Sequence, residues 1–380
     1  MTETTNDKNA NWAYTDYNPV RITAGSGSID KLFTIDPPVT TGKRIFMVTS
    51  AGFTSRGITA RIEAQGRKHG LENPILVFDG VTANPELDLL DRIATGLRSE
   101  GINGIIALGG GSVLDTAKAI SVALPSELEH PLDMVLRQKK PYTWKDRIPV
   151  VAVPTTAGTG AEVTPFATVW DSENKKKYSV SGEMVYPVHA LLDPELTLTL
   201  PPKETLYTGL DAISHALESL WNKNRTPVSK ALALKALSLA NEALPAVLNQ
   251  PDSLYFREMM QQAALLAGLA ISRTRTAIAH AISYSLTMRF GVPHGLACSF
   301  ILPDIIKYYI PNEKDGAIKS AINKTLSMLE GLNLDGEMGA FVKDADLSKY
   351  VREMFHPDRT GNFSVSIANN HIESFLRHNN

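Results

Sequence analysis

The sequence contains little cysteine: Cys298 is the single thiol among 380 residues. An intramolecular disulfide is therefore excluded, as is usual for proteins of a reducing compartment. The chain also lacks an excess of charge of either sign, because 38 Lys and Arg stand against 40 Asp and Glu, for a net charge of −2. Nucleic-acid-binding domains usually carry a basic excess, so we expect no nucleic-acid partner.

Long uncharged apolar runs are also absent. No such run reaches transmembrane length, and the polar residues 1–11 lack the apolar segment of a signal peptide. We therefore expect a cytoplasmic protein with no membrane partner. A chain of 380 residues exceeds what one compact core usually accommodates, which predicts two domains.

The first half of the chain alternates short apolar runs with helical segments. Strands are predicted at Lys43–Thr49, Pro74–Asp79, Ile102–Leu108 and Ile148–Val153, helices at Thr54–His69 and Pro85–Ser99, and a hairpin at Val163–Trp170 and Lys176–Ser181. This order is typical of a Rossmann-like α/β domain whose parallel sheet is covered on both faces. The three lysines from Lys175 to Lys177 look like a solvated turn of the hairpin.

The pattern of apolar residues changes after Pro201 and Pro202. Helical spacing then dominates in Ser229–Leu248, Leu254–Ala270, Ala277–Phe290 and Ile318–Leu332. No strand pattern follows residue 200. We predict an α/β dinucleotide-binding domain over residues 1–200 and an all-helical metal-binding domain over residues 201–380, with the proline pair as the boundary.

Two glycine-bearing loops follow predicted strands. Gly109, Gly110 and Gly111 let the backbone approach a ligand closely, and Ser112 is placed to cap the next helix. Free N–H groups at that helix start favour a phosphate. The second loop, Pro154–Glu162, offers three hydroxyls, from Thr155, Thr156 and Thr159. Both loops leave the carboxyl ends of parallel strands, where such sheets bind ligands, so nucleotide binding is favoured over a purely geometric need for glycine.

Four residues of the helical half form a candidate metal site. Asp211 and His215 are spaced to project from one helix face. With His280 and His294 they would supply one carboxylate and three imidazoles, a set suited to a divalent metal. Each of the four also has a structural explanation, as a surface carboxylate or a buried histidine, and spacing alone leaves both open. Cys298, in an apolar segment, is expected to pack in the core.

These motifs resemble those of the iron-containing (group III) alcohol dehydrogenases, and they occur along the chain in the same order as in that family. The resemblance rests on GGGSVLD, PTTAGTGAE, the DPEL of residues 193–196, GLDAISHALE and the two later histidines, and it covers about residues 17–311. It implies a dehydroquinate synthase-like architecture with a cleft between two domains. It implies metal ligands at Asp211, His215, His280 and His294, and cofactor contacts at Gly110, Gly111, Ser112, Asp115, Thr155, Thr156 and Thr159, more loosely at Lys177 and Leu196.

The resemblance implies an NAD(P)H oxidoreductase that interconverts a small aldehyde and its primary alcohol. The divalent metal, Fe²⁺ with Zn²⁺ as the alternative, would polarise the carbonyl, and the nicotinamide would supply hydride. A homodimer is the assembly we consider. Two other classes stay open: a metal-dependent lyase of the dehydroquinate-synthase type and a non-catalytic nucleotide-sensing protein.

The chain departs from the family pattern at two positions. Many members carry a further histidine where this chain has Tyr284, which leaves Tyr284 as one source of the proton. Many NAD-preferring members have an acidic residue where this chain has Ser50; because an acidic side chain repels a 2′-phosphate, Ser50 leaves both NAD and NADP open.

The segment around His280 is similar to the branch that reduces phosphonoacetaldehyde and other anionic aldehydes. Arg273 and Arg275 are the predicted anion-binding residues. Arg273 lies seven residues before His280, and on one continuous helix this spacing is about 10.5 Å, within partial reach of a long side chain. The alternative is that both arginines cover a surface or pair with acidic neighbours.

Overall fold

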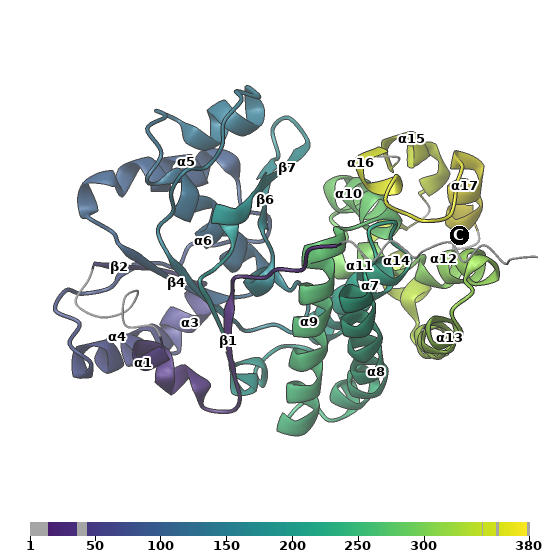
Figure 1. Cartoon of the computed structure of the whole chain (residues 1–380), viewed down its shortest axis with the longest axis horizontal. Coiled ribbons are helices and arrows are strands. Elements are labelled where there is room, and N and C mark those ends of the chain that lie inside the picture. The colour runs from purple at the N-terminus through teal and green to yellow at the C-terminus, as the bar shows by residue number, and fades with distance from the viewer. Residues whose placement is uncertain (1–13, 36–43, 344, 355–356, 378–380) are drawn as a thin grey trace, which may run out of the picture.

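The computed structural model describes residues 14–35, 44–343, 345–354 and 357–377. An α/β part and a helical part lie side by side (Figure 1). The α/β part contains a six-stranded sheet in the order β1 (Arg21–Ala24), β8 (His189–Leu192), β5 (Val150–Pro154), β4 (Gly104–Gly109), β2 (Ile45–Val48) and β3 (Leu76–Phe78). All five strand pairs are parallel. The predicted fold class is confirmed.

Helices cover both faces of the sheet because successive side chains of its inner strands point to opposite faces. On β4, Ile105 and Ala107 pack with α5 (Leu87–Gly96) and α6 (Gly111–Ala123), whereas Ile106 and Leu108 pack towards α1 (Leu32–Ile35) and α4 (Ile58–Lys68). The near-continuous apolar runs follow from this double burial.

Two local differences from the predictions have physical reasons. The predicted helix over 54–69 is two helices, α3 (Ala51–Ser55) and α4, because Gly57 adopts a left-handed φ of 74° between them. The sequence analysis did not predict β1 or β8. Each has four residues; β1 is an edge strand with alternating polar residues, and β8 reads His-Ala-Leu-Leu, which has little β-branched character. The predicted hairpin is present as β6 (Phe166–Asp171) and β7 (Lys176–Ser181), paired antiparallel.

The helical part follows from residue 202. Its helices are α7 (Pro202–Leu220), α8 (Pro227–Asn249), α9 (Leu254–Thr274), α10 (Ile278–Phe290), α11 (His294–Ser299), α12 (Leu302–Tyr309), α13 (Gly316–Glu330), α14 (Leu334–Val342), α15 (Val351–Met354), α16 (Pro357–Thr360) and α17 (Asn369–Arg377). Within the described part of residues 202–377 the β-pairing is limited to one isolated bridge, between Asn222 and Phe363. One apolar core of side chains runs through these helices.

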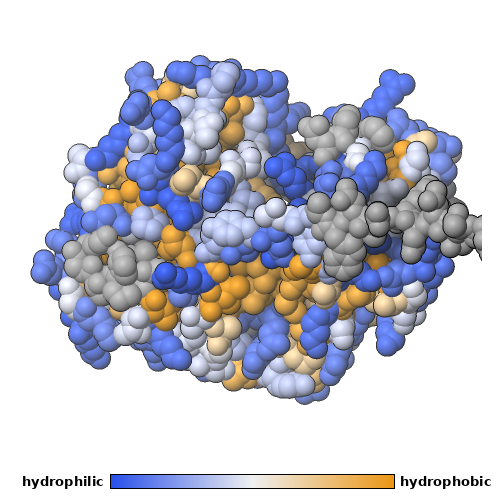
Figure 2. All heavy atoms as spheres, in the orientation of Figure 1, coloured by the Kyte–Doolittle hydropathy of each residue, from blue (hydrophilic) through white to orange (hydrophobic). Residues whose placement is uncertain are grey.

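Helix α8 is the one described helix long and apolar enough to cross a membrane by length and composition, and 39 % of its most apolar window is buried. Its residues Ala236, Leu237 and Leu244 lie in the core shared with α7 and α9. The same test is passed by core helices of soluble proteins. Figure 2 shows apolar side chains gathered on the face along which α9 runs.

Candidate active site

A cavity of about 770 Å³ lies where the two parts of the chain meet. From the α/β part it is lined by residues at the carboxyl ends of β2, β4 and β5, including Ser50, Gly110 and Thr155. From the helical part it is lined by the candidate metal ligands. The carboxyl edge of a parallel sheet is where α/β proteins bind ligands, because its strands deliver their loops to one edge.

The two predicted phosphate loops pack against each other at this edge. A Cβ at Gly111 would lie 2.6 Å from Cγ2 of Thr159, and one at Gly110 would lie 3.2 Å from Cγ2 of Thr156, so side chains there would force the loops apart. Gly110 is the N-cap of α6, without a side-chain hydrogen bond. Ser112 is therefore inside the first turn and does not cap the helix as expected. First-turn N–H groups have no partner within their helix and are suited to an anion.

The remaining predicted cofactor residues differ in position. Ser50, Ser112, Asp115 and all three threonines line the cavity. The Asp115 carboxylate also accepts a hydrogen bond from the N–H of Thr168 at 2.8 Å and lies 3.6 Å from Lys118 Nζ, so it ties α6 to β6. Burial raises the pKa of Asp115, against the nearby Lys118. Leu196 does not line the cavity. It packs against the core on the face of the sheet that α1 and α4 cover.

The four predicted metal ligands lie close together on the side of the cavity that the helical part forms. The Oδ1 atom of Asp211 lies 3.5 Å from Nε2 of His280, 3.7 Å from Nε2 of His215 and 3.9 Å from Nε2 of His294. Asp211 Oδ1 and His280 Nε2 are buried and have no hydrogen-bond partner among the described residues. Donors spaced by about 3.3–3.8 Å suit one ion with bonds of about 2.0–2.3 Å. The residues therefore fit a divalent metal.

Close packing brings α11 to α7. A Cβ at Gly295 would lie 1.8 Å from the carbonyl oxygen of Tyr207, so no larger residue fits beside His294 at this point. The glycine lets His294, the first residue of α11, approach Asp211 on α7. The glycine that follows His294 is thus a structural requirement of the cluster.

The protonation states of this cluster differ among its members. The pKa shifts of Asp211, His215 and His294 favour the forms that bind a cation, whereas at His280 the effect of Cys298 and Glu218 outweighs that of burial, and the raised pKa favours the protonated ring. Burial alone would raise the pKa of Asp211, but the neighbouring imidazoles of His215, His280 and His294 outweigh it, and the net pKa is lowered. Burial lowers the pKa of His215 and of His294, and Lys177 adds to the effect at His294. An ionised carboxylate and neutral imidazoles are the forms that bind metals.

Glu218 is a functional residue that the sequence analysis did not single out. Its fully buried carboxylate lies 2.9 Å from Nδ1 of His280 and accepts hydrogen bonds from the N–H groups of Ala277 at 2.7 Å and His280 at 3.2 Å. Burial raises the pKa of Glu218, but His280 outweighs it and the net shift is downward. Glu218 thereby fixes the ring so that Nε2 faces the cluster, as carboxylates do for metal-bound histidines. Its place seven residues after Asp211 on the same helix face was an available signal.

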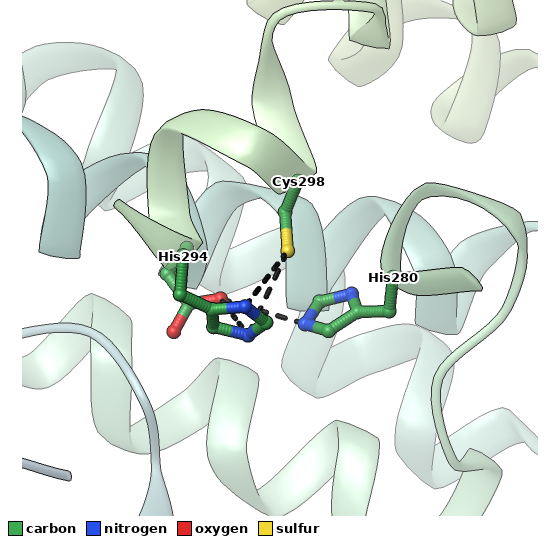
Figure 3. A group of neighbouring side chains, drawn as sticks. His280, His294 and Cys298 are labelled. Atoms are coloured by element: carbon green, nitrogen blue, oxygen red, sulfur yellow. Dashed lines mark hydrogen bonds and ion pairs between the residues drawn. The ribbon is translucent and has the colours of Figure 1, made fainter. Parts of the chain in front are cut away.

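Cys298 does not only pack in the core, as the sequence suggested. It lies one helical turn after His294, and the ligand atoms of Asp211, His280, His294 and Cys298 are all within 4.8 Å of one another. Figure 3 shows the side chains of His280, His294 and Cys298 pointing towards one another. The spacing of four residues between His294 and Cys298 was an available signal, but the approach of α11 to α7 and α10 was not encoded locally.

Two cations lie over the ring of Tyr284, which follows His280 by one turn of α10. Lys177 Nζ is 3.8 Å and Arg359 Cζ is 4.6 Å from the ring centroid, and all three residues line the cavity. The prediction of a solvated lysine turn is thus wrong for Lys177, whose pKa burial and the Arg359 charge lower to about 7. Burial raises the pKa of the Tyr284 phenol, which keeps it protonated.

The geometric reason for assigning anion binding to Arg273 is wrong. Helix α9 ends at Thr274 and α10 begins at Ile278, because Arg275 has a φ of 64° and interrupts the helix. Arg273 pairs with Asp16 and its Nη1 also donates to the carbonyl of Leu269, outside the cavity lining. Arg275, which is exposed, does line the cavity.

Comparison with known proteins agrees with this geometry. Residues 19–194 match the family described as Iron-containing alcohol dehydrogenase, and residues 205–354 match the Fe-containing alcohol dehydrogenase family, C-terminal. The sulfoacetaldehyde reductase of Bilophila wadsworthia is 31 % identical over 90 % of this chain and 86 % of its own. The chain belongs to the iron-containing alcohol dehydrogenase family.

Other members extend this result. The phosphonoacetaldehyde reductase of Streptomyces viridochromogenes is 36 % identical over 71 % of this chain and 68 % of its own. The solved structure of the sulfoacetaldehyde reductase from Bifidobacterium kashiwanohense in complex with NAD⁺ has a TM-score of 0.85 and 27 % identity, covering 96 % of this chain and 98 % of that one. The chain is thus an NAD(P)-dependent alcohol dehydrogenase or aldehyde reductase, and the lyase and nucleotide-sensing alternatives find no support.

Arg359, like Glu218, is a residue of this site that the sequence analysis did not single out. It belongs to α16, in the last forty residues, where no periodic pattern was visible. Arg359 Nη1 donates to the hydroxyl of Thr276, and Asn362 Nδ2 donates to the carbonyl of Thr276 at 2.8 Å. These contacts tie the C-terminal segment to the break between α9 and α10, so a distant part of the chain completes the cavity of this iron-containing alcohol dehydrogenase.

Proposed function

We propose that this enzyme reduces a small aldehyde bearing an anionic group, such as phosphonoacetaldehyde or sulfoacetaldehyde, to its primary alcohol. The observation that carries the proposal is the pair of cations, Lys177 and Arg359, over the ring of Tyr284. Tyr284 lies one turn from His280, so an aldehyde whose oxygen is at the metal cluster would hold its other end towards the cations. Two relatives are named for such aldehydes.

The chemistry of the anion suits these side chains. A guanidinium binds phosphonate or sulfonate oxygens in a bidentate manner, and an ammonium adds a compact charge. Both act strongly here because burial lowers the effective dielectric constant around them. Arg275, at the rim, adds a third positive charge.

We assign the roles of the reaction as follows. Asp211, His215, His280 and His294 are the candidate holders of a divalent metal, Fe²⁺ with Zn²⁺ as the alternative. When bound, this ion supplies Lewis-acid polarisation of a carbonyl, and the nicotinamide supplies hydride. Glu218 orients His280, and the protonated phenol of Tyr284 is the proposed source of the proton that completes the alcohol.

We assign cofactor binding to the loops at the carboxyl edge of the sheet. Gly110, Gly111 and Ser112 present first-turn N–H groups to the phosphates, and Thr155, Thr156 and Thr159 line the cavity beside them on the adjoining loop. Ser50 and Asp115 line the same region, and the lack of an acidic side chain at Ser50 supports the use of NADPH as well as NADH. Lys177 is reassigned from the cofactor to the substrate anion, and Leu196 is left without a role in binding.

Assembly and location extend the proposal. We keep the division into an α/β domain over residues 1–200 and a helical domain over 201–380, with the cavity between them. A homodimer is proposed, supported by the apolar side chains that gather over α9 (Figure 2), and sedimentation analysis would test it. The single cysteine supports a cytoplasmic location.

The deciding experiment compares phosphonoacetaldehyde with propanal. In Arg359→Ala, the ratio of kcat/KM for phosphonoacetaldehyde to that for propanal should fall by about 2 kcal/mol, the lower end for a buried charge pair, or roughly 30-fold. Arg273→Ala is the matched control, because it removes an arginine that lies outside the cavity lining, and it should leave the ratio unchanged. Equal losses for both aldehydes in Arg359→Ala would leave a general small-aldehyde reductase.

A further inference from the structure

Arg275, in the break between α9 and α10, has a backbone conformation that is normally restricted to glycine. Its φ of 64° and ψ of 172° lie in a region where the Cβ of other residues collides with the backbone. Among the described non-glycine residues with a positive φ, only Asn84 and Arg275 line the cavity. Asparagine tolerates a positive φ better than arginine does. Strain of this kind is concentrated at functional sites and persists only where the surrounding structure holds it.

Hydrogen bonds on both sides of Arg275 hold this conformation. Its N–H donates to the carbonyl of Ile271 at 2.8 Å. Its carbonyl accepts hydrogen bonds from Asn222 Nδ2 at 3.0 Å and from Thr274 Oγ1 at 3.2 Å. Asn222 is only 3 % exposed and lies two residues after the end of α7, whereas Ile271 and Thr274 belong to α9 itself. Asn222 is therefore the contact through which another helix fixes the strained carbonyl.

The side chain of Arg275 has no partner within the protein that would explain the strain. Its guanidinium forms no hydrogen bond or ion pair with a described residue, whereas Arg273 pairs with Asp16. Arg275 lines the cavity, and the next residue, Thr276, accepts the hydrogen bond from Arg359, so the two arginines belong to the same end of the cavity. Because φ and ψ set the direction of Cβ, relaxation of this backbone would move the guanidinium away from its present place.

We propose that Arg275 determines selectivity for an anionic aldehyde and that Asn222 is the positioning residue that holds it. By fixing the strained carbonyl, Asn222 keeps an unpaired guanidinium at the cavity, where it can bind oxygens of the anion. The turn thus sacrifices stability for recognition of the substrate. The inference rests on the proposed function, because it requires a substrate whose anionic end lies near Arg359.

Two substitutions of Arg275 separate the charge from the strain. Arg275→Gly and Arg275→Ala both remove the guanidinium, so in both the ratio of kcat/KM for phosphonoacetaldehyde to that for propanal should fall roughly fivefold, the size of an exposed charge pair. Only glycine relieves the backbone. The Tm of Arg275→Gly should therefore exceed that of Arg275→Ala by about 2 °C. This order is the reverse of the usual one, in which glycine is less stabilising than alanine.

Lys139 provides the matched control for the strain. It also has a positive φ, of 55°, and it is exposed and lies outside the cavity lining. Lys139→Gly should again have a higher Tm than Lys139→Ala, because the same kind of strain is relieved. The ratio of kcat/KM for the two aldehydes should be the same as in the wild type in both Lys139 variants.

The role of Asn222 is tested through its dependence on Arg275. Asn222→Leu keeps the approximate size of the side chain without its donor. It should lower the ratio for the two aldehydes, by no more than Arg275→Ala does, whereas a merely structural role would lower kcat/KM equally for both. In the Arg275→Gly background the same substitution should lower the ratio no further, because the two residues act as one unit. Asn222→Ser gives the same comparison if Asn222→Leu does not fold.

Each contrary result has one meaning. If both Arg275 variants keep the ratio of the wild type while Arg359→Ala lowers it, this inference is overturned and the proposed function stands. If Arg359→Ala also leaves the ratio unchanged, the proposed function fails as well. An Arg275→Gly variant that is no more stable than Arg275→Ala contradicts the strain, and a further fall of the ratio in the double variant contradicts the positioning role of Asn222.

Discussion

The α/β part and the helical part supply different kinds of atoms to one cavity. The α/β part contributes mainly backbone N–H groups and small hydroxyls at the ends of strands, as at Gly111 and Thr159, with Asp115 and Lys177 as ionisable side chains beside them. The helical part contributes ionisable side chains, as at Asp211 and His280. The first kind of site depends on where the backbone can go, whereas the second depends on how helices pack.

Both parts use glycine for close approach, but with different results. Gly111 lets the loops after β4 and β5 come into contact at the edge of the sheet. These two strands are adjacent, and each loop can be recognised from a short stretch of sequence. Gly295 lets α11 approach α7, which is more than seventy residues earlier, and so completes a cluster that no local pattern encodes. The two parts should therefore respond independently to substitution, one in cofactor preference and the other in metal content.

The largest expected effect separates the two parts directly. His280→Ala removes a metal ligand, and activity should fall by more than the roughly 100-fold that loss of an outer-shell partner can cost. Metal content by elemental analysis should fall with it. NADPH binding, measured by fluorescence titration, should be unchanged, because the loops lie in the other part. Full activity after exhaustive chelation, with no metal detected, would contradict the metal role.

The pH dependence concerns Lys177 of β7, a charged side chain that the α/β part adds to the cavity. Lys177 has a pKa of about 7, lowered by burial and by Arg359, while Cys298, Asp115 and Asp211 act in the opposite direction. The side chain of Lys177 is a charged ammonium below this pKa and a neutral amine above it. As pH rises through 7, kcat/KM for phosphonoacetaldehyde should fall, by about tenfold one unit above the pKa, because kcat/KM reports the free enzyme.

Propanal and one variant supply the controls. Propanal carries no anion and should not show this fall between pH 7 and pH 8. In Lys177→Met, which keeps the length of the side chain without its charge, the profile for phosphonoacetaldehyde should become flat over the same range. A fall of the same size for both aldehydes in the wild type would assign the titration to another group.

The two parts also differ in how far their sequence predicts their structure. Apolar runs and glycines identified four of the six strands and both loops, because strand periodicity and backbone freedom are local properties; β1 and β8 were missed because they are short and have little β-branched character or lie at the edge. The candidate metal ligands were predicted from the helical spacing of Asp211 and His215 and from the order of the family's motifs along the chain. The helical segments predicted at 254–270 and 277–290 left a gap that contains the break at Arg275, although the positive φ of this arginine has no local signal. Arg359 was missed because its contacts with Thr276 join segments that are distant in the sequence.

The smallest expected effect belongs to the α/β part and concerns the choice of cofactor. Ser50 lies two residues after the end of β2, lines the cavity and forms an isolated bridge to Gly80, so it lies at the carboxyl edge of the sheet. An aspartate there would repel the 2′-phosphate of NADPH and accept hydrogen bonds from the ribose of NADH. Ser50→Asp should therefore shift the ratio of kcat/KM for NADPH to that for NADH by about 1 kcal/mol, roughly fivefold, towards NADH. Ser50→Asn has nearly the same size without the charge and should shift the ratio much less, while metal content should stay the same in both variants. An equal shift with asparagine would indicate a steric effect, and a wild type that excludes NADPH would show that Ser50 does not occupy the position that reads the 2′-phosphate.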